Sequence, residues 1–310
     1  MMSALRSGFK VNVDRLSRAQ VPERRTRDDV VAAQYDPPDA AAGYGDSHEG
    51  VGPAARFFRS RIYLISQTLA SCRGGDLLDV GCGPGMMVRE LLDSRPGDFR
   101  ITALDRSSAM VNACALRAAG AHDFHALIGR VEQMEFPDAS FDVVLAMGVL
   151  EYVDVAEALA EISRVTRPDG LILVTMLNPL SPYRFVEWHV YWRLLRVLRA
   201  VEALLTVPLD MRHDAGPTGM RAYSQGALRK MMTDAGLRVV DVAYFDVTLL
   251  VPPIDRIVRR WARGWQKRPE RTISRRWRRA LGTGYMIVGR NAPAPDATSG
   301  RPHRNQPAQH

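Results

Sequence analysis

A glycine-rich turn between a strand-like run and a helix-like run constrains this chain more than any other feature. Gly81, Gly83 and Gly85 stand at alternate positions, at the end of a predicted strand and just before a helical pattern at 86–93. Glycine permits positive φ angles and lets a ligand approach bare backbone, and the following helix start offers unpaired N–H groups. A strand, a glycine turn and a helix in this order predict a nucleotide-type ligand site at the carboxyl end of a sheet strand.

The spacing of these glycines narrows the class of site. The dinucleotide fingerprint is G-x-G-x-x-G, whereas the third glycine here comes one residue early, as G-x-G-x-G. The chain also lacks the G-x-x-x-x-G-K-S/T pattern of phosphate-binding loops. The turn therefore departs from the dinucleotide pattern and is not a P-loop.

From this turn onward, strand and helix patterns alternate, which predicts a parallel α/β sheet. A helix at 54–71 is predicted to pack against the sheet just before the first strand, because its apolar residues recur at helical spacing. The remaining predicted helices lie at 86–93, 108–119, 154–166 and 224–235. The predicted strands lie at 77–81, 100–105, 124–129, 142–147, 170–177, 237–246 and 283–290.

The run L-D-V-G-C-G-P-G at residues 78–85 closely resembles motif I of the class I S-adenosylmethionine-dependent methyltransferases. Residues 54–178 resemble this family well, and residues 218–246 resemble it more loosely. The similarity is to type 11/25 methyltransferases, including small-molecule and quinone-biosynthesis-type members. The resemblance implies S-adenosylmethionine as the cofactor. It also implies a Rossmann-like, seven-stranded, mostly parallel sheet with helices on both faces, whose last two strands return antiparallel.

The resemblance assigns parts of the cofactor to particular residues. The glycine turn would admit the amino-acid part and the ribose, Asp79 would hold the ammonium group, and Asp105 would accept hydrogen bonds from both ribose hydroxyls. Arg130 stands where relatives often carry an Asp that binds the adenine amino group, so the backbone of Val131 and Glu132 would serve there instead. The expected cofactor-binding residues are Asp79, Gly81, Cys82, Gly83, Gly85, Asp105, Arg106, Val131, Glu132, Met147 and Gly148.

Methyl transfer from a sulfonium is an in-line displacement, so the enzyme chiefly aligns the nucleophile, the methyl carbon and the sulfur. A hydroxyl acceptor also needs a general base. We expect His189 to be this base, because its helix belongs to a segment that would cap the site. Glu151 and Tyr152 are further catalytic candidates, at positions where many family members carry histidines. The remaining candidates for the base are Glu187, His213 and Tyr223. No metal-binding cluster is visible in the sequence, so we expect no metal.

The chain divides into a core domain and additions to it. The methyltransferase domain is expected to span 54–290. A flexible arm and N-terminal cap precede it at 1–53, with a short helix at 30–35 and a loop at 40–53. The other additions are two insertions, at 178–222 and 247–282, and a polar, proline-rich tail at 291–310 that we expect to be disordered.

The two insertions are the parts of the chain that we expect to determine which acceptor binds. The first contains residues 178–184, where we expect substrate contact, and a helical run at 183–205 that holds aromatic and aliphatic residues beside arginines. This run either packs one amphipathic face on the domain or forms a lid over an apolar acceptor. In the second insertion, residues 254–279 hold three tryptophans among many arginines. A solvated basic face or an oligomer contact is the preferred interpretation, and contact with a membrane surface or with an anionic substrate is the alternative.

Composition adds little about partners. The net charge of +8 comes almost wholly from arginine, which a GC-rich genome also favours, so we do not expect nucleic acid binding. The three cysteines lack zinc-type spacing and indicate a reducing compartment. No apolar signal segment or spanning run is visible. We therefore expect a cytoplasmic protein, with membrane association through 254–279 left open.

These observations predict a methyltransferase that acts on a small or lipophilic acceptor, with O-methylation as the first expectation. C- or N-methylation of a natural product or lipid is an alternative, since one fold hosts many acceptors. A different class of function is a non-catalytic partner protein that binds S-adenosylmethionine. Such a protein would keep the glycine turn and Asp105 yet lack a closed acceptor pocket under the 178–222 cap.

Overall fold

The computed structural model describes residues 26–37, 40–49, 53–204, 220–248, 273 and 281–292. Several features predicted from the sequence lie outside these residues. They are the arm at 1–25, His213, almost all of the tryptophan-rich stretch 254–279, and the tail from 293 onward.

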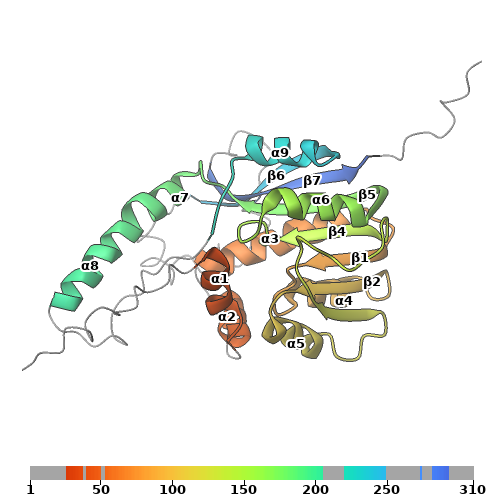
Figure 1. Ribbon diagram of the computed structural model, residues 1–310, viewed down its shortest axis with the longest axis horizontal. Helices are drawn as coiled ribbons and strands as arrows, with labels where there is room; N and C mark the ends of the chain where they lie inside the picture. Colours follow the sequence, from red (N-terminus) through yellow and green to blue (C-terminus); the bar gives the residue numbers. More distant parts are fainter. Residues whose placement is uncertain are drawn as a thin grey trace, which may run out of the picture.

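In the described part of the chain, a seven-stranded sheet in the order β3-β2-β1-β4-β5-β7-β6 forms the centre of the domain (Figure 1). Strands β1 to β5 pair in parallel, whereas β7 pairs antiparallel with both β5 and β6. Each of these strands falls where the sequence predicts one, and the mostly parallel α/β fold is confirmed. The strands are β1 (Gly75–Val80), β2 (Phe99–Asp105), β3 (Phe124–Ile128), β4 (Phe141–Met147), β5 (Thr166–Leu177), β6 (Leu237–Val247) and β7 (Gly282–Asn291).

The expected direction of β6 is wrong. Because β6 is antiparallel to β7 and β7 is antiparallel to β5, β6 runs in the same direction as β5. The chain reaches β6 from β5 through helix α9 (Gln225–Asp234), and a strand–helix–strand crossover returns the second strand parallel to the first. Within the described sheet, β7 is thus the strand that opposes the others.

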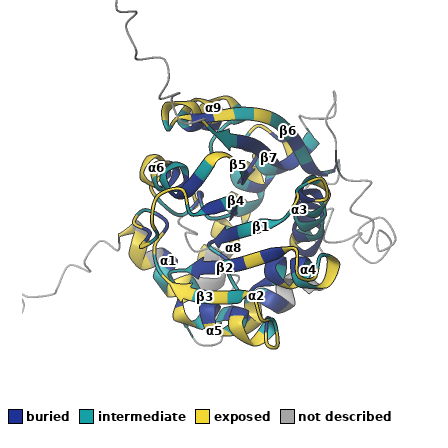
Figure 2. Cartoon of the chain, turned by 90° about the vertical axis from the view of Figure 1, so that its right-hand side faces the viewer, coloured by how far each residue is buried: buried dark blue, intermediate teal, exposed yellow. Residues whose placement is uncertain are grey.

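Helices cover both faces of the sheet, and buried residues fill the space between the layers (Figure 2). One core lies between the sheet and helices α3 (Pro53–Leu69), α4 (Met86–Ser94) and α5 (Ser108–Arg117). The other lies under α6 (Val155–Val165) and α9. Since successive strand residues point to opposite faces, Leu77 joins the first core and Leu78 the second. This layered core brings the carboxyl ends of the parallel strands to one edge of the domain.

The predicted loop at 40–53 is wrong, because residues Ala40–Glu49 form helix α2. Its sequence has two glycines and weak helix propensity, which favours a loop. Tertiary contacts outweigh that propensity: Ala41 is buried, and the Tyr44 ring packs edge-on against Phe58 at 5.5 Å between centroids. The short helix predicted at 30–35 is confirmed, but α1 begins earlier and spans Arg27–Tyr35, because Thr26 and Asp29 form a capping box.

The helical run predicted at 183–205 is confirmed as α7 (Pro182–Val186), a π-helical turn η2 (Glu187–Tyr191) and α8 (Trp192–Leu204). Helix α8 projects away from the sheet (Figure 1). Its apolar stripe is exposed, with Leu194 at 61% and Val197 at 64% accessibility, so packing of this face on the described part of the domain is excluded. None of the described helices is both long and apolar enough to pass through a lipid bilayer.

Candidate functional site

The glycine turn connects β1 to α4, and its three glycines have positive φ angles of 66°, 52° and 80° at Gly81, Gly83 and Gly85. The backbone N–H groups of Gly81 and Cys82 donate to the carbonyl oxygen of Leu104, at 2.7 and 3.1 Å. These two hydrogen bonds hold the turn against the end of β2. The turn is therefore preorganised by its neighbouring strand.

The three glycines serve different physical purposes. A Cβ atom at Gly85 would lie 2.7 Å from Sγ of Cys114 and 3.0 Å from its Cα, so Gly85 lets α5 pack closely on the turn. A Cβ atom at Gly81 would lie 2.7 Å from the Val149 side chain. At Gly83 the nearest atom would be 3.9 Å away, on Tyr44. Gly83 thus presents bare backbone to open space.

That open space is a cleft at the carboxyl ends of β1, β2 and β4, where ligands of open α/β sheets bind. Among the expected site residues, those that line it are Gly81, Gly83, Asp105, Arg106, Val131, Glu132, Met147, Gly148 and Tyr152. Asp79, Cys82, Gly85, Glu151 and His189 do not line it. The N-terminal helices contribute lining residues that sequence reasoning missed, namely Val31, Tyr35 and Tyr44.

Asp105 ends β2 and lies beside the glycine turn. Its Oδ2 accepts a hydrogen bond of 2.9 Å from the N–H of Gly83, and its Oδ1 accepts one of 2.9 Å from the N–H of Ser107. Burial raises the pKa of the Asp105 carboxyl, and these two hydrogen bonds partly oppose the increase. Asp105 therefore ties the start of α5 to the turn and presents its carboxylate to the cleft.

Asp79 is fully buried near the end of β1, one residue before Val80, which lines the cleft. Neither of its carboxylate oxygens accepts a hydrogen bond from a described residue. Burial, together with the nearby charge of Asp105, raises the pKa of Asp79 to about 7. Buried carboxylates without partners are costly, so this side chain fits a site whose ligand brings a positive charge.

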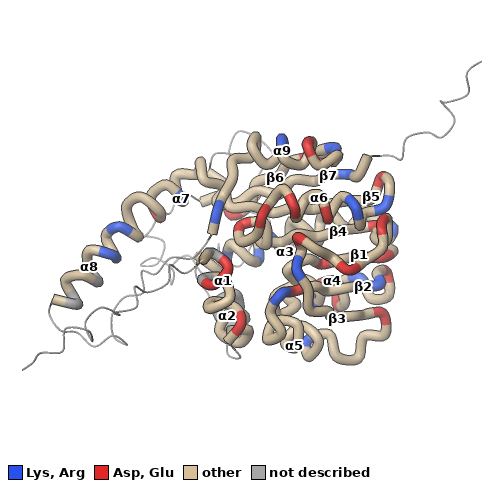
Figure 3. Tube along the Cα trace, viewed as in Figure 1, with Lys and Arg blue, Asp and Glu red and all other residues tan. Residues whose placement is uncertain are grey.

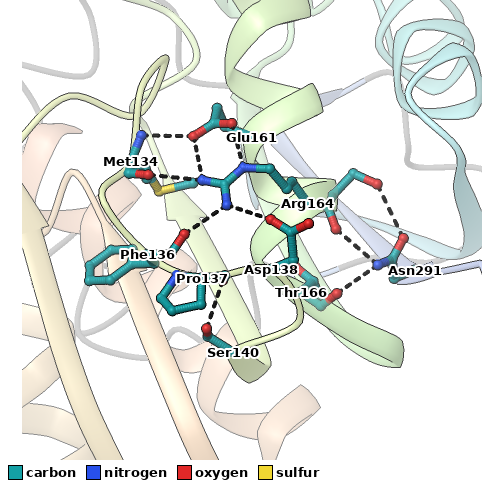
Figure 4. Close-up of polar contacts among 10 residues, drawn as sticks. Met134, Phe136, Pro137, Asp138, Ser140, Glu161, Arg164, Thr166 and Asn291 are labelled. Carbon is teal, nitrogen blue, oxygen red and sulfur yellow. Dashed lines mark hydrogen bonds and ion pairs between the residues drawn. The ribbon is translucent and has the colours of Figure 1, made fainter.

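The loop after β3 forms another wall of the cleft. Its Arg130 pairs with Asp28 of α1 at 3.1 Å and with Glu132 at 3.0 Å, and thus connects the loop to the N-terminal helices. Arg164 of α6 anchors the following residues by donating to the carbonyl oxygens of Met134 and Phe136 and to the carboxylates of Asp138 and Glu161 (Figure 4). This anchor holds the loop in place beside the cleft.

Three tyrosines line the cleft where the N-terminal helices meet the loop after β4. The Tyr35 hydroxyl donates to the Tyr152 hydroxyl at 2.8 Å, and the Tyr35 ring packs edge-on against Tyr152 and Tyr44. Ser107 holds this arrangement by donating its hydroxyl to the Tyr35 carbonyl at 2.7 Å. Burial raises the pKa of each of these phenols, so they stay protonated.

Glu151 lies in the loop after β4 with 3% of its surface exposed. Its Oε1 accepts a hydrogen bond of 3.2 Å from the N–H of Leu177 at the end of β5. Burial raises the pKa of Glu151 to about 7, and the charges of Arg61 and Arg184 partly oppose the increase. A carboxyl with this pKa can exchange a proton near neutral pH.

Arg61 is a residue that sequence reasoning missed. It is buried in α3, with its guanidinium carbon 4.1 Å above the centroid of the Phe58 ring and a hydrogen bond to Tyr44. An arginine at helical spacing from Phe57, Phe58 and Ile65, within an otherwise apolar stripe, was the available signal. A charged side chain on the buried face of a helix usually has a partner inside the protein, because unpaired charges are rarely buried.

His189, the expected general base, is not brought to the cleft. It is exposed on η2, where its ring packs against Phe185 at 4.8 Å between centroids. Residues two positions apart on a helix point in different directions, and Glu187 is the buried residue of this pair. Its carboxylate forms an ion pair with Arg184. Tyr223 packs against the core under α6 and α9, away from the cleft lining.

Comparisons with known proteins agree with this geometry. The family described as "Methyltransferase domain" matches residues 78–174. A nocamycin O-methyltransferase from Saccharothrix syringae is 30% identical over 215 residues, which cover 67% of this chain and 74% of that protein. A malonyl-(acyl-carrier protein) O-methyltransferase from Serratia marcescens is 42% identical over 105 residues, 34% of this chain, and the match spans 39% of that relative's length.

A solved structure shows the same fold. It is a chain of the complex that contains the Haloferax volcanii Trm112 methyltransferase activator, with a TM-score of 0.53 and 22% identity. The alignment covers 85% of this chain and 98% of that one. With the glycine turn, the acid at the end of β2, the seven-stranded sheet and these relatives in agreement, the chain belongs to the class I S-adenosylmethionine-dependent methyltransferases, a family of enzymes for which S-adenosylmethionine is the cofactor.

Proposed function

We propose that the protein methylates a hydroxyl group on a small or lipophilic acceptor and that Glu151 is its general base. The observation that carries this proposal is a buried carboxyl with a pKa of about 7 in the loop after β4, between the cleft-lining residues Val149 and Tyr152. The relatives named above as O-methyltransferases support oxygen as the acceptor atom.

S-adenosylmethionine supplies an electrophilic methyl group on a sulfonium when it is bound. We propose that the backbone at Gly81 and Gly83 and the side chains of Asp79 and Asp105 hold its amino-acid part and ribose. The unpartnered, buried carboxylate of Asp79 supports a role toward the ammonium group. The proposed contacts to the remaining parts of the cofactor are made by Arg106, Val131, Glu132, Met147 and Gly148, which all line the cleft.

Cys82 and Gly85 take a different role in this proposal. Cys82 is buried, and its hydrogen bond with Cys114 together with burial raises the pKa of its thiol. Gly85 packs against the same cysteine of α5. We therefore propose that these two residues shape the turn from behind and do not touch the cofactor.

The Glu151 carboxylate would take the proton that leaves the acceptor hydroxyl as its oxygen attacks. The charges of Arg61 and Arg184 keep the pKa of Glu151 from rising further. General bases work best with a pKa near the working pH, and such a base contributes about 10²- to 10⁴-fold to the rate. Tyr152 would close the cleft through its hydrogen bond with Tyr35 and keep water away from the reacting groups.

The test combines binding with turnover. Calorimetry should detect S-adenosylhomocysteine binding to the intact protein and to Glu151→Gln with similar affinity. Transfer of a labelled methyl group to a fraction of cell-extract metabolites should fall by at least about 100-fold in Glu151→Gln. The pH profile of wild-type kcat/KM should rise to a plateau above about pH 7, because Glu151 must lose its proton to act.

Two outcomes would contradict the proposal. Unchanged turnover in Glu151→Gln would remove Glu151 as the base and leave C- or N-methylation as the better alternative. Tight binding of S-adenosylhomocysteine with no methyl transfer to any extract fraction would favour a non-catalytic partner protein.

We also propose that α8 and the stretch 254–279 contact an anionic lipid surface. Helix α8 carries Arg193 and Arg196 beside its exposed apolar stripe, and its basic positions lie along the projecting helix (Figure 3). Basic amphipathic helices with this pattern bind membrane interfaces. The protein should sediment with phosphatidylserine vesicles, and Leu194→Glu together with Val197→Glu should abolish this. Sedimentation that is unaffected by these changes would contradict the role of α8.

A further inference from the structure

The short turn after β3 is held against the end of β2. The N–H of Gly129 donates to the Asp105 carbonyl oxygen at 2.9 Å, and a Cβ atom at Gly129 would lie 2.7 Å from the Leu104 side chain. Arg130 and Gln133 then form an isolated β-bridge, which folds the chain back on itself. The turn is therefore fixed directly beside Asp105.

The residues around Glu132 in this turn are anchored as well. Val131 is buried in the core under α6 and α9. The N–H of Met134 donates to the Glu161 carboxylate at 2.7 Å, and Arg164 donates to that carboxylate and to the Met134 carbonyl oxygen (Figure 4). Glu132 is thus carried on a backbone that is held on both sides.

The Glu132 carboxylate has one oxygen in use and one free. Its Oε1 accepts a hydrogen bond of 3.0 Å from Arg130, which also pairs with Asp28 of α1 at 3.1 Å. No described residue donates to Oε2. Glu132 lines the cofactor cleft, and 11% of its side chain is exposed. A largely buried carboxylate oxygen needs a hydrogen-bond donor, so this position suits a ligand that brings an N–H or O–H group.

Asp105 and Glu132 are the two acids among the described residues that line the cleft. Asp105 accepts from the N–H groups of Gly83 and Ser107 and is the proposed partner of the ribose. Glu132 follows the next strand outward, since the sheet order is β3-β2-β1-β4. A group on the ribose that extends away from the glycine turn would therefore reach Glu132. In S-adenosylmethionine this group is adenine, whose 6-amino group is a hydrogen-bond donor.

We propose that the free carboxylate oxygen of Glu132 accepts a hydrogen bond from the adenine amino group, and that Arg130 positions this carboxylate. The inference rests on the proposed placement of the cofactor, and it adds a side chain to the backbone contact expected from the sequence. A carboxylate only accepts hydrogen bonds, so it disfavours a base with an oxo group at position 6. Glu132 is thus a specificity-determining residue.

The test compares two ligands that differ at one edge of the base. S-inosylhomocysteine has an oxo group where S-adenosylhomocysteine has the 6-amino group, and its N1 carries a hydrogen. Calorimetry on the full chain with each ligand gives the ratio of the two affinities. Wild type should favour S-adenosylhomocysteine by at least about 100-fold, because the oxo group would face a carboxylate that cannot donate. A wild-type ratio near one would overturn the inference.

Glu132→Gln keeps the size of the side chain and replaces one acceptor with an amide donor. The affinity ratio should fall by at least about tenfold, because the amide can donate to the oxo group. S-inosylhomocysteine should bind this variant at least as tightly as it binds the wild type, a result that a misfolded variant could not give. An unchanged ratio would overturn the role of Glu132.

Three further variants separate the roles of the neighbouring charges. Arg130→Met removes the cation that holds Glu132, so it should lower the ratio by about threefold or more. Asp28→Asn should leave the ratio unchanged, because Asp28 does not line the cleft. Glu135→Gln is the matched control, since Glu135 is an exposed acid of the same loop.

Each of these variants can contradict the proposal. An unchanged ratio in Arg130→Met would overturn the positioning role of Arg130. A ratio that falls in Asp28→Asn or Glu135→Gln as far as in Glu132→Gln would show that the general charge of the region makes the selection, and would overturn the assignment to Glu132.

Binding of S-adenosylhomocysteine separates these failures from those of the proposed function. Absence of binding by the wild type would remove the proposed cofactor contacts altogether. Normal binding with an unchanged ratio in Glu132→Gln would overturn the present inference alone. Glu151→Gln should keep the wild-type ratio even where its turnover is lost, because Glu151 does not line the cleft.

Discussion

The guanidinium of Arg61 occupies the space directly beside Gly148, at the carboxyl end of β4, where a side chain would otherwise project. Gly148 has a φ of 71° and lines the cofactor cleft, whereas Arg61 comes from α3, far away in the sequence. The charge of Arg61 also lowers the pKa of Asp79 and of Glu151, against the larger effect of burial. One buried cation thus connects the proposed cofactor carboxylate with the proposed base.

Gly148→Ala should displace Arg61 and weaken S-adenosylhomocysteine binding by at least about tenfold, because the added methyl group overlaps Nη1. Gly97→Ala is the control, since Gly97 has a similar φ of 78° and no heavy atom within 4 Å of a Cβ. Each substitution adds backbone strain of about 1–2 kcal/mol, so thermal melts should show a similar loss of stability from this cause in both variants. Equal cofactor affinity in the two variants would contradict the role of Arg61.

Asp79 should make the ligand-free protein less stable as the pH rises. Its pKa is raised from 3.8 to about 7 on folding, so the folded state binds more protons than the unfolded state between these values. The free energy of unfolding is therefore not reduced by Asp79 below about pH 4. It decreases between about pH 4 and pH 7, by an amount on the order of 4 kcal/mol. Asp79→Asn should remove this part of the pH dependence in urea unfolding, and an unchanged slope would show that Asp79 titrates normally.

The same carboxyl should make cofactor binding pH dependent. If Asp79 holds the ammonium group, it must be charged in the complex, so binding should tighten as the pH rises toward about 7 and then level off. The affinity for S-adenosylhomocysteine, measured by calorimetry between about pH 6 and 8, should change by up to about tenfold in the wild type. Asp79→Asn should bind more weakly at pH 8 and show a flat profile. A steep profile in Asp79→Asn would assign the titration to another group.

Two neighbouring glycines should separate ligand binding from stability. Gly83→Ala places a methyl group in open cleft space, so it should weaken S-adenosylhomocysteine binding while costing about 1–2 kcal/mol of stability from its φ of 52°. Gly85→Ala places its methyl group 3.0 Å from the Cys114 backbone, so it should cost about 2–4 kcal/mol. Urea unfolding and calorimetry on both variants test this contrast, and the reverse order of stabilities would contradict it.

Local patterns predicted most of the scaffold. Several features follow from residues that are close together in the sequence, because the interactions that favour them are short-range. They are the alternating strands and helices, the positive φ angles of the glycine turn, and the acid that ends β2. The exceptions show where such reasoning ends. Helix α2 contradicts its own propensity, because Tyr44 is held by Phe58 of α3. The inward residue of η2 is Glu187, not His189, because helix phase depends on what the cap packs against.

The sequence alone therefore determined the fold class and the donor, because the strand, the glycine turn and the start of the next helix follow one another directly in the chain. Tertiary structure alone decided which titratable groups are buried together. Asp79, Glu151 and Arg61 come from β1, the loop after β4 and α3, and burial raises the pKa of both carboxyls only once these elements pack. Desolvation depends on the whole molecule, so no local pattern encodes it.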